Sequence, residues 1–172
     1  MNKKIIIGGT VAVLFAALGI FIGQRQTTLH TPEKSAVDNL LSQSMTDASG
    51  KSHAMAQWKN KALVVNFWAT WCAPCVDEMP ELSALQTEIQ PKIQILGIGI
   101  DSASNIAEFS SKYKISYPLY VAGANGTELS RQLGNQAGGL PFTVLIGYDG
   151  QVKKTYLGRL KMSELRKDLT AI

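Results

Sequence analysis

The segment NFWATWCAPC, residues 66–75, joins an apolar stretch to a Cys-x-x-Cys turn that contains both cysteines of the chain, Cys72 and Cys75. Two thiols at this spacing can form a disulfide with each other. A helix that begins at Cys72 favours its thiolate, because the first N–H groups of a helix lack backbone partners and the helix dipole is positive there. Only the thiolate attacks a disulfide. The segment therefore predicts dithiol–disulfide exchange.

Two other roles for the cysteine pair fit the sequence less well. A structural zinc site needs about four ligands, whereas the two histidines, His30 and His53, lie far upstream without the spacing of a zinc finger. A disulfide that only staples the fold would close a very small loop, and the stabilisation from chain entropy shrinks with loop size. We therefore expect redox activity at Cys72 and Cys75, with no metal site and no cofactor.

Length and composition predict one catalytic domain. The chain has 172 residues, and 45% of them are apolar, which is enough for one well-filled core. Its net charge is +4, but without Lys3 and Lys4 fifteen basic residues face thirteen acidic ones. The basic surface expected of a nucleic-acid-binding protein is therefore missing, and we expect no nucleic acid among the partners.

The N-terminus predicts a single membrane-spanning anchor. Lys3 and Lys4 precede an uncharged apolar run from Ile5 to Gly23. As a helix this run would be about 28 Å long, close to the hydrocarbon thickness of about 30 Å. Basic flanks stay in the cytoplasm, so the catalytic domain would lie on the periplasmic or extracytoplasmic side of the inner (cytoplasmic) membrane. A cleaved signal peptide is the alternative, but the small-residue site Ala17-Leu18-Gly19 lies within the apolar run.

The chain is thus expected to contain three regions. Residues 1–23 form the membrane anchor, residues 24–38 form a polar tether, and residues 39–172 form the catalytic domain. The tether is predicted from a polar composition that includes Pro32 and shows no apolar period.

Alternating strands and helices predict an α/β fold for the domain. Residues 93–100 form an almost continuous apolar run, typical of a strand that helices cover on both faces. Apolar residues recur every three or four positions after the cysteines, which indicates a helix; they are Val76, Met79, Leu82, Leu85 and Ile89. The other expected elements are a hairpin around Gly50, strands at 62–68, 118–121, 142–146 and 151–157, and helices near 106–113, 129–133 and after an N-cap at Ser163. This order predicts a mixed central sheet with helices on both faces.

Two motifs resemble those of a known group. Residues 66–75, followed by EMPEL at 78–82, are similar to the TlpA/ResA branch of membrane-anchored, thioredoxin-like disulfide reductases, and GLPFT at 139–143 is similar to the second signature of that family. The resemblance covers nearly everything after the tether. It implies a thioredoxin-like sandwich, a hairpin extension around Gly50, a strand–helix insertion at about residues 101–133, and a cis peptide bond before Pro141 that faces the dithiol.

Roles for the site residues follow from the motif and from the resemblance together. Cys72 lies at the start of the helix and is expected to attack, while Cys75 lies one turn inside and is expected to resolve the mixed disulfide. A cis bond at Pro141 leaves the backbone of Leu140 free to pair with an extended client segment. Trp71 is expected either as a docking surface or as a core residue.

The proton that Cys75 must gain or lose needs a partner group. Cytosolic thioredoxins place a buried aspartate where this chain has Asn66, and asparagine cannot supply a proton. The resembling branch often places an acidic residue in the insertion, and Asp101 is the candidate here. A plain helix-capping or loop role is an equal alternative for Asp101.

The residues between and after the cysteines favour a reductase. Pro74 has no N–H to donate to the sulfur of Cys72, and Asp77, Glu78 and Glu81 add negative charge in the next turns. Both effects oppose a strongly lowered pKa, so we expect the pKa of Cys72 at roughly 7 rather than the 3.5 of a strong oxidant. A less stable thiolate belongs to a more reducing dithiol.

The resemblance implies client proteins that carry a disulfide, such as apocytochrome c or copper-site proteins, and a membrane electron donor that reduces the dithiol again. A disulfide oxidase or isomerase is the main alternative. A thiol peroxidase or a copper carrier fits less well, because Cys72 lacks the context of a peroxidatic cysteine and the motif has no nearby histidine or methionine pair.

Overall fold

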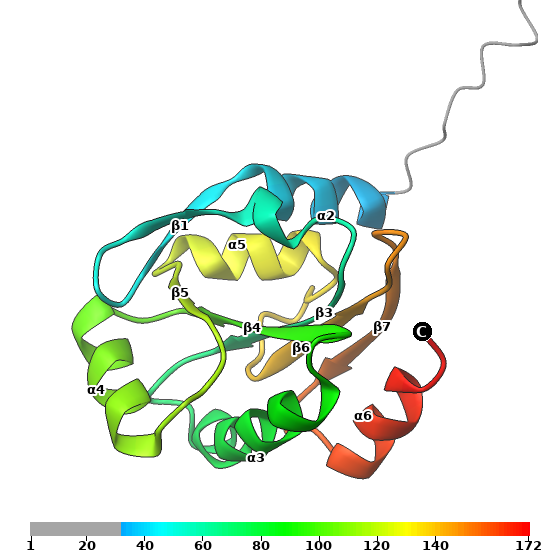
Figure 1. Cartoon of the computed structure of the whole chain (residues 1–172). Coiled ribbons are helices and arrows are strands. Elements are labelled where there is room, and N and C mark those ends of the chain that lie inside the picture. The colour runs from blue at the N-terminus through cyan, green and yellow to red at the C-terminus, as the bar shows by residue number, and fades with distance from the viewer. Residues whose placement is uncertain (1–31) are drawn as a thin grey trace, which may run out of the picture. The chain divides into compact units, whose positions relative to one another are not determined.

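The computed structural model describes residues 32–172, and these residues fold around one seven-stranded sheet (Figure 1). The predicted anchor, most of the predicted tether and His30 lie outside the described residues. Within the described part of the chain, no helix is long and apolar enough to cross a bilayer.

The helices are α2 (Pro32–Ser42), the short 3-10 helix η1 (Met55–Trp58), α3 (Ala73–Ile89), α4 (Ala103–Tyr113), α5 (Asn125–Gln132) and α6 (Met162–Leu169). The strands are β1 (Ser44–Asp47), β2 (Ser52–Ala54), β3 (Ala62–Trp68), β4 (Ile93–Gly99), β5 (Leu119–Val121), β6 (Phe142–Ile146) and β7 (Val152–Leu157).

The sheet has the order β2-β1-β5-β4-β3-β6-β7, so β2 and β7 form its edges. Strands β3, β4 and β5 run parallel, and the strands outside them join in antiparallel fashion. All seven residues of β3 are buried, as expected for an apolar strand that is covered on both faces. The dithiol follows the carboxyl end of β3, the end at which the sites of open α/β sheets lie.

Helices cover both faces of the sheet. Helices α2 and α5 lie on one face, and α3, α4 and α6 lie on the other (Figure 1). Side chains alternate along β3, so Val65 and Phe67 join the core beneath α2 and α5, while Val64 and Trp68 join the core beneath α3, α4 and α6. The predicted α/β sandwich with a mixed sheet is therefore confirmed, as are the hairpin around Gly50 and the strand at 62–68.

The structure corrects the end of the predicted tether. Helix α2 begins at Pro32, so residues 32–38 are helical and belong to the domain. Proline suits the first turn of a helix, where its missing N–H is not needed. Four apolar residues share one face of α2 and are buried on the sheet; they are Ala36, Val37, Leu40 and Leu41. A polar opposite face concealed this helical period in the sequence.

Two helix starts also differ from the prediction. Helix α6 begins at Met162 with Lys161 in the N-cap position, so Ser163 is not the cap. Helix α5 begins already at Asn125. Its predicted end is close, because Gly134 follows it with φ +109°, a conformation that glycine adopts readily.

Candidate active site

The dithiol lies where β3 turns into α3. Cys72 occupies the N-cap position of α3 and forms a disulfide with Cys75 in the first turn, with the two Cα atoms 5.3 Å apart. The Cys72 N–H donates to the carbonyl of Ala69 at 3.2 Å, and Pro74 stands in the first helical turn, where a proline is tolerated. Cys72 is 7% exposed and Cys75 is 0% exposed. An attacking group from solvent can therefore reach Cys72 but not Cys75.

Two segments that were predicted to contact clients lie at the same end of the sheet. The Leu140–Pro141 bond is cis, and β6, which starts directly after it, pairs Phe142 with Phe67 near the end of β3. Leu140 is partly buried against the core that contains both cysteines. Trp71 is 70% exposed, so the structure favours the docking surface over the core role for its indole ring.

Glu78 is the residue that the sequence reasoning missed. It is 0% exposed, although it carries a carboxyl group. Its Oε1 accepts a hydrogen bond from Asn66 Nδ2 at 2.8 Å, and its Oε2 accepts one from the Leu160 N–H at 2.8 Å. Burial raises the pKa of Glu78 to about 7, against the opposing effect of these two hydrogen bonds. A carboxyl with this pKa can both take up and release a proton near neutral pH.

The position of Glu78 on α3 explains its burial. It follows Cys75 by three residues, and residues three apart lie on the same side of a helix. Cys75 and Met79 are fully buried on that side, so Glu78 must point inward with them. This spacing from a buried cysteine is the sequence signal that could have identified it, because negative charge alone does not distinguish Glu78 from the other acidic residues of α3.

Asn66 connects Glu78 to the strand behind it. Its Nδ2 donates to Glu78 and, at 3.0 Å, to Thr143 Oγ1. Its Oδ1 is buried and has no hydrogen-bond partner among the described residues. A carboxylate only accepts hydrogen bonds, but a protonated carboxyl also donates one. An Asn66 amide turned by half a rotation would accept from that O–H and from the Thr143 hydroxyl, so asparagine suits both protonation states of Glu78.

Asp101 is held by the turn that precedes α4 and by the loop before the dithiol. Its Oδ2 accepts from the Thr70 hydroxyl and, at 3.1 Å, from the Thr70 N–H, and its Oδ1 accepts from Ser102 N–H and Asn105 Nδ2 at 2.7 Å each. Partial burial acts to raise the pKa of Asp101, but these hydrogen bonds outweigh it and the pKa stays below its ordinary value. The geometry thus favours the loop role for Asp101, because Ser102 is the N-cap of α4, and it points to Glu78 as the proton-exchanging group.

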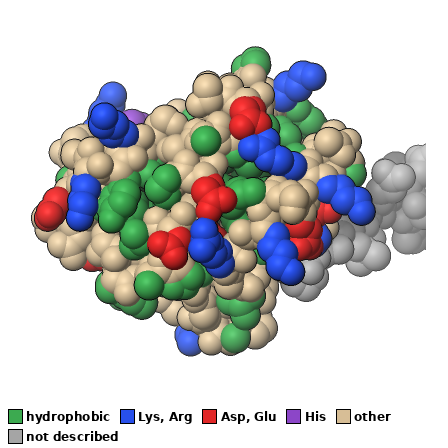
Figure 2. Space-filling view, turned by 90° about the horizontal axis from the view of Figure 1, so that it is seen from below, with side chains coloured by type: hydrophobic (Ala, Val, Ile, Leu, Met, Phe, Trp, Pro, Cys, Tyr) green, Lys and Arg blue, Asp and Glu red, His purple; other side chains and the backbone are tan. Residues whose placement is uncertain are grey.

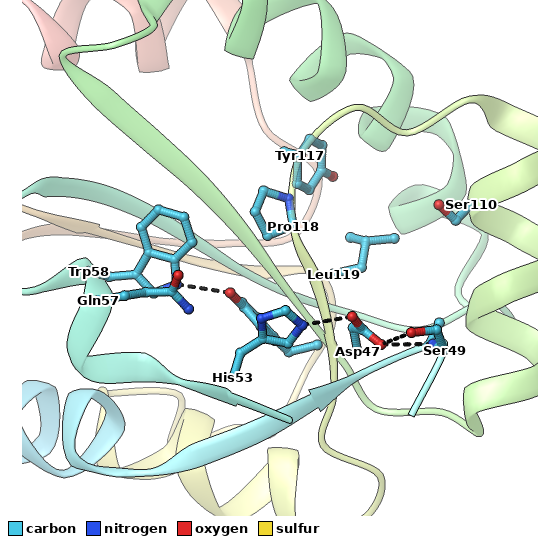
Figure 3. Close-up of a pocket in the computed structure, with 11 residues that line it drawn as sticks. Asp47, Ser49, His53, Gln57, Trp58, Ser110, Tyr117, Pro118 and Leu119 are labelled. Atoms are coloured by element: carbon cyan, nitrogen blue, oxygen red, sulfur yellow. Dashed lines mark hydrogen bonds and ion pairs between the residues drawn. The ribbon is translucent and has the colours of Figure 1, made fainter. Parts of the chain in front are cut away.

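A second candidate place for chemistry is a cavity of about 470 Å³ between the β1–β2 hairpin, η1 and the start of β5 (Figure 3). Two pairs of its polar groups are bonded: His53 Nε2 lies 2.7 Å from Asp47 Oδ2, and Trp58 Nε1 donates to the Tyr120 hydroxyl at 2.9 Å. The cavity opens beside the start of β5, whereas the dithiol follows the opposite end of the parallel strands. The first of these bonds joins β1 to β2 within the hairpin, and the second joins η1 to β5. Both have a structural role, and we place the reaction at the dithiol.

Comparisons with known proteins agree with this site. The Redoxin family model matches residues 32–169. The thiol-disulfide oxidoreductase ResA of Geobacillus thermodenitrificans (strain NG80-2) is 29% identical over 167 residues, which cover 93% of this chain and 90% of that protein. The ResA protein of Bacillus cereus (strain ZK / E33L) is 31% identical over 131 residues, which cover 74% of this chain and 73% of that protein.

Solved structures share the fold. A secreted Mycobacterium tuberculosis disulfide oxidoreductase, described as homologous to Escherichia coli DsbE, aligns with a TM-score of 0.67 at 22% identity and covers 78% of this chain and 99% of its own. A thiol:disulfide interchange protein of the thioredoxin family from Chlorobium tepidum aligns with a TM-score of 0.65 at 27% identity and covers 75% of this chain and 91% of its own. With its bonded cysteine pair at the start of α3, the chain belongs to the Redoxin family and is a thiol-disulfide oxidoreductase similar to ResA.

Proposed function

We propose that this oxidoreductase reduces disulfides in exported client proteins, with Cys72 as the attacking thiol, Cys75 as the resolving thiol and Glu78 as the group that exchanges a proton with Cys75. One observation carries the proposal. A cysteine that keeps 7% of its surface exposed, a fully buried cysteine and a fully buried glutamate follow one another along the first two turns of α3.

The reaction starts from the reduced dithiol. The Cys72 thiolate attacks one sulfur of the client disulfide, a new S–S bond joins Cys72 to the client, and the other client sulfur leaves as a thiolate that takes a proton from water. Cys75 then gives its proton to the Glu78 carboxylate and attacks the Cys72 sulfur. The bond between Cys72 and the client breaks, and the second client thiolate takes a proton from water. The Cys72–Cys75 disulfide is the oxidised product, and two electrons have passed to the client.

Burial of Cys75 is the reason that a proton acceptor is required. A thiol has a pKa of about 8.5 in water, and burial raises it because the charged thiolate loses its solvation. Water cannot reach Cys75 to take its proton. Glu78 lies one turn away on the same side of α3, and a carboxyl with a pKa of about 7 is ionised often enough at neutral pH to act as the base. In the reverse step the protonated Glu78 returns the proton to Cys75.

Sequence features support the reductive direction and the location. Ala73 and Pro74 place neither a cation nor an N–H donor between the cysteines, so the Cys72 thiolate is not stabilised to the degree that makes a strong oxidant. The predicted anchor supports work at the outer side of the inner membrane. There, a membrane-bound dithiol donor would return two electrons and two protons. Apocytochrome c and copper-site proteins are the client classes that the ResA-like resemblance suggests.

A redox titration of the full chain against glutathione or dithiothreitol tests the direction. A potential near about −270 mV supports a reductase, and a potential near about −120 mV would instead support the oxidase alternative. A Cys75→Ser variant should then trap exported clients as mixed disulfides at Cys72, with Cys72→Ser as the matched control. Trapping by Cys72→Ser alone would reverse the assignment of attacker and resolver.

A further inference from the structure

The loop between β7 and α6, residues 158–161, contacts two parts of the active site and is called the strap here. The Gly158 N–H donates to the carbonyl of Pro141 at 2.8 Å, and the Leu160 N–H donates to Glu78 Oε2 at 2.8 Å. Gly158 has φ +86°, a conformation that favours glycine. The side chain of Leu160 is buried in the core that contains both cysteines. One short loop thus joins the cis-proline turn to the proton-exchanging carboxyl.

Arg159 fastens the strap to the outer side of α3. Its Nη2 lies 2.8 Å from Glu81 Oε1, and its Nη1 lies 3.6 Å from Asp77 Oδ2. Asp77 directly precedes Glu78 in α3, and Glu81 follows it three positions later. The guanidinium group therefore bridges two surface carboxylates above the buried one. Acidic and basic side chains lie next to each other on the face of the molecule seen in Figure 2.

We propose that Arg159 is a positioning residue for the disulfide exchange: by tying the strap to Asp77 and Glu81, it holds the Leu160 N–H against Glu78 and fixes the proton affinity of that carboxyl. The inference rests on the proposed role of Glu78. It adds that Arg159, a cation on the surface, sets the pH range in which the buried Glu78 exchanges its proton with Cys75.

The charges around Glu78 determine the sign of the effect. Burial raises the pKa of Glu78, the hydrogen bonds from Leu160 and Asn66 lower it, the positive charge of Arg159 lowers it, and the negative charge of Glu81 raises it. Tyr117, in the segment before β5, is buried, and its pKa lies well above the ordinary value because of burial and the nearby Glu78, so it stays neutral. The cysteines carry no charge while they are bonded. Loss of Arg159 removes an attraction and loosens the Leu160 hydrogen bond, and both changes raise the pKa of Glu78.

The test compares Arg159→Met with Arg166→Met in the oxidised full chain in detergent solution. Both arginines are about half exposed, and both pair with a glutamate of α3, but the partner of Arg166 is Glu88, almost three turns beyond Glu78. The carboxyl carbon of Glu78 is followed by NMR between about pH 4 and pH 9, a window that includes both its shifted and its ordinary pKa. Glu78→Gln identifies its resonance.

Arg159→Met is expected to raise the pKa of Glu78 by about half to one pH unit, while Arg166→Met leaves it unchanged and Arg159→Lys restores most of the wild-type value. Salt offers a second readout. At about 1 M salt the screening length falls to about 3 Å, so the wild-type pKa should rise toward that of Arg159→Met, and the variant should respond less. Equal pKa values in Arg159→Met and Arg166→Met would overturn the inference.

Failure of the underlying function gives a different result. The pH dependence of the rate at which dithiothreitol reduces the Cys72–Cys75 disulfide should lose its Glu78 contribution in Glu78→Gln. If Glu78→Gln and the wild type show the same pH dependence, the proton-exchange role itself is wrong. If Glu78→Gln changes the pH profile but Arg159→Met does not shift it, only the role of Arg159 is wrong.

Discussion

Replacement of Glu78 by glutamine should change how the stability of the oxidised protein depends on pH. The side chain is fully buried, and its pKa is about 7 in the folded state compared with 4.5 for an ordinary glutamate. The folded state therefore binds the proton more tightly than the unfolded state. Stability from this group is fully present below the unfolded pKa and is lost as the pH rises through the folded pKa.

The size of the effect follows from the two pKa values of Glu78. Each pKa unit corresponds to about 1.4 kcal/mol, so the wild type should lose about 3 kcal/mol between about pH 4 and pH 8 through Glu78 alone. Glutamine does not titrate. It keeps one oxygen to accept from Leu160 or Asn66, but it loses the second acceptor, which is a constant cost at every pH.

Urea unfolding of the full chain, followed by tryptophan fluorescence, measures the difference between variant and wild type at the two ends of this range. We expect the difference to move by about 3 kcal/mol in favour of Glu78→Gln as the pH rises from about 4 to about 8. Glu128→Gln, at an exposed position of α5, serves as the control and should show no comparable change. A difference that is the same at both pH values would refute the argument, because it would mean that Glu78 titrates as an ordinary glutamate.

Three other outcomes are expected. Trp71→Ala should leave the free energy of unfolding within about 0.5 kcal/mol of the wild type, because Trp71 is 70% exposed. The variant should raise KM for a disulfide-bonded protein client without slowing the reduction of its own disulfide by dithiothreitol. An equal loss in both reactions would argue against a docking role. Asp101→Asn should cost about 1–2 kcal/mol in urea unfolding at neutral pH, since the pKa of Asp101 is lowered in the folded state, and the cost should disappear as the pH falls through that lowered value. Its exchange rate should equal that of the wild type, and a rate loss like that of Glu78→Gln would return Asp101 to the proton-transfer step. Leu40→Ala in α2 should cost about 2–5 kcal/mol, because Leu40 is fully buried; a loss below about 0.5 kcal/mol would show that α2 does not contribute to the core.

The central elements could be predicted because their signals are local. Strand β3 is apolar except for Asn66, and the apolar stripe of α3 repeats with a helical period directly after the cysteines. The Cys-x-x-Cys turn lies between them. Each of these patterns is contained in a short window of sequence, and burial in the structure follows the pattern.

The spacing from Cys75 places Glu78 on the inward side of α3, but the partners that allow its carboxyl to be buried lie outside this window. One of its hydrogen-bond donors, Leu160, lies 82 positions later in the chain, and the other, Asn66, lies on a different element. A buried carboxyl depends on such long-range partners. The same distance problem applies to α2. Its polar outer face outweighs, in the sequence pattern, a narrow apolar face that the sheet, η1 and α5 cover. In both cases contacts with distant parts of the chain bury the residues, whereas the local composition predicts that they are exposed.

The two edges of the sheet have a consequence for a protein that acts on disulfide-bearing clients. Strand β2 is only three residues long, and β7 presents Lys153 and Lys154 along its length. Short or lysine-bearing edges are poor templates for strand addition. Both edges are therefore poor places for the backbone of a client, or of a second copy of the chain, to add a strand and extend the sheet into a fibril.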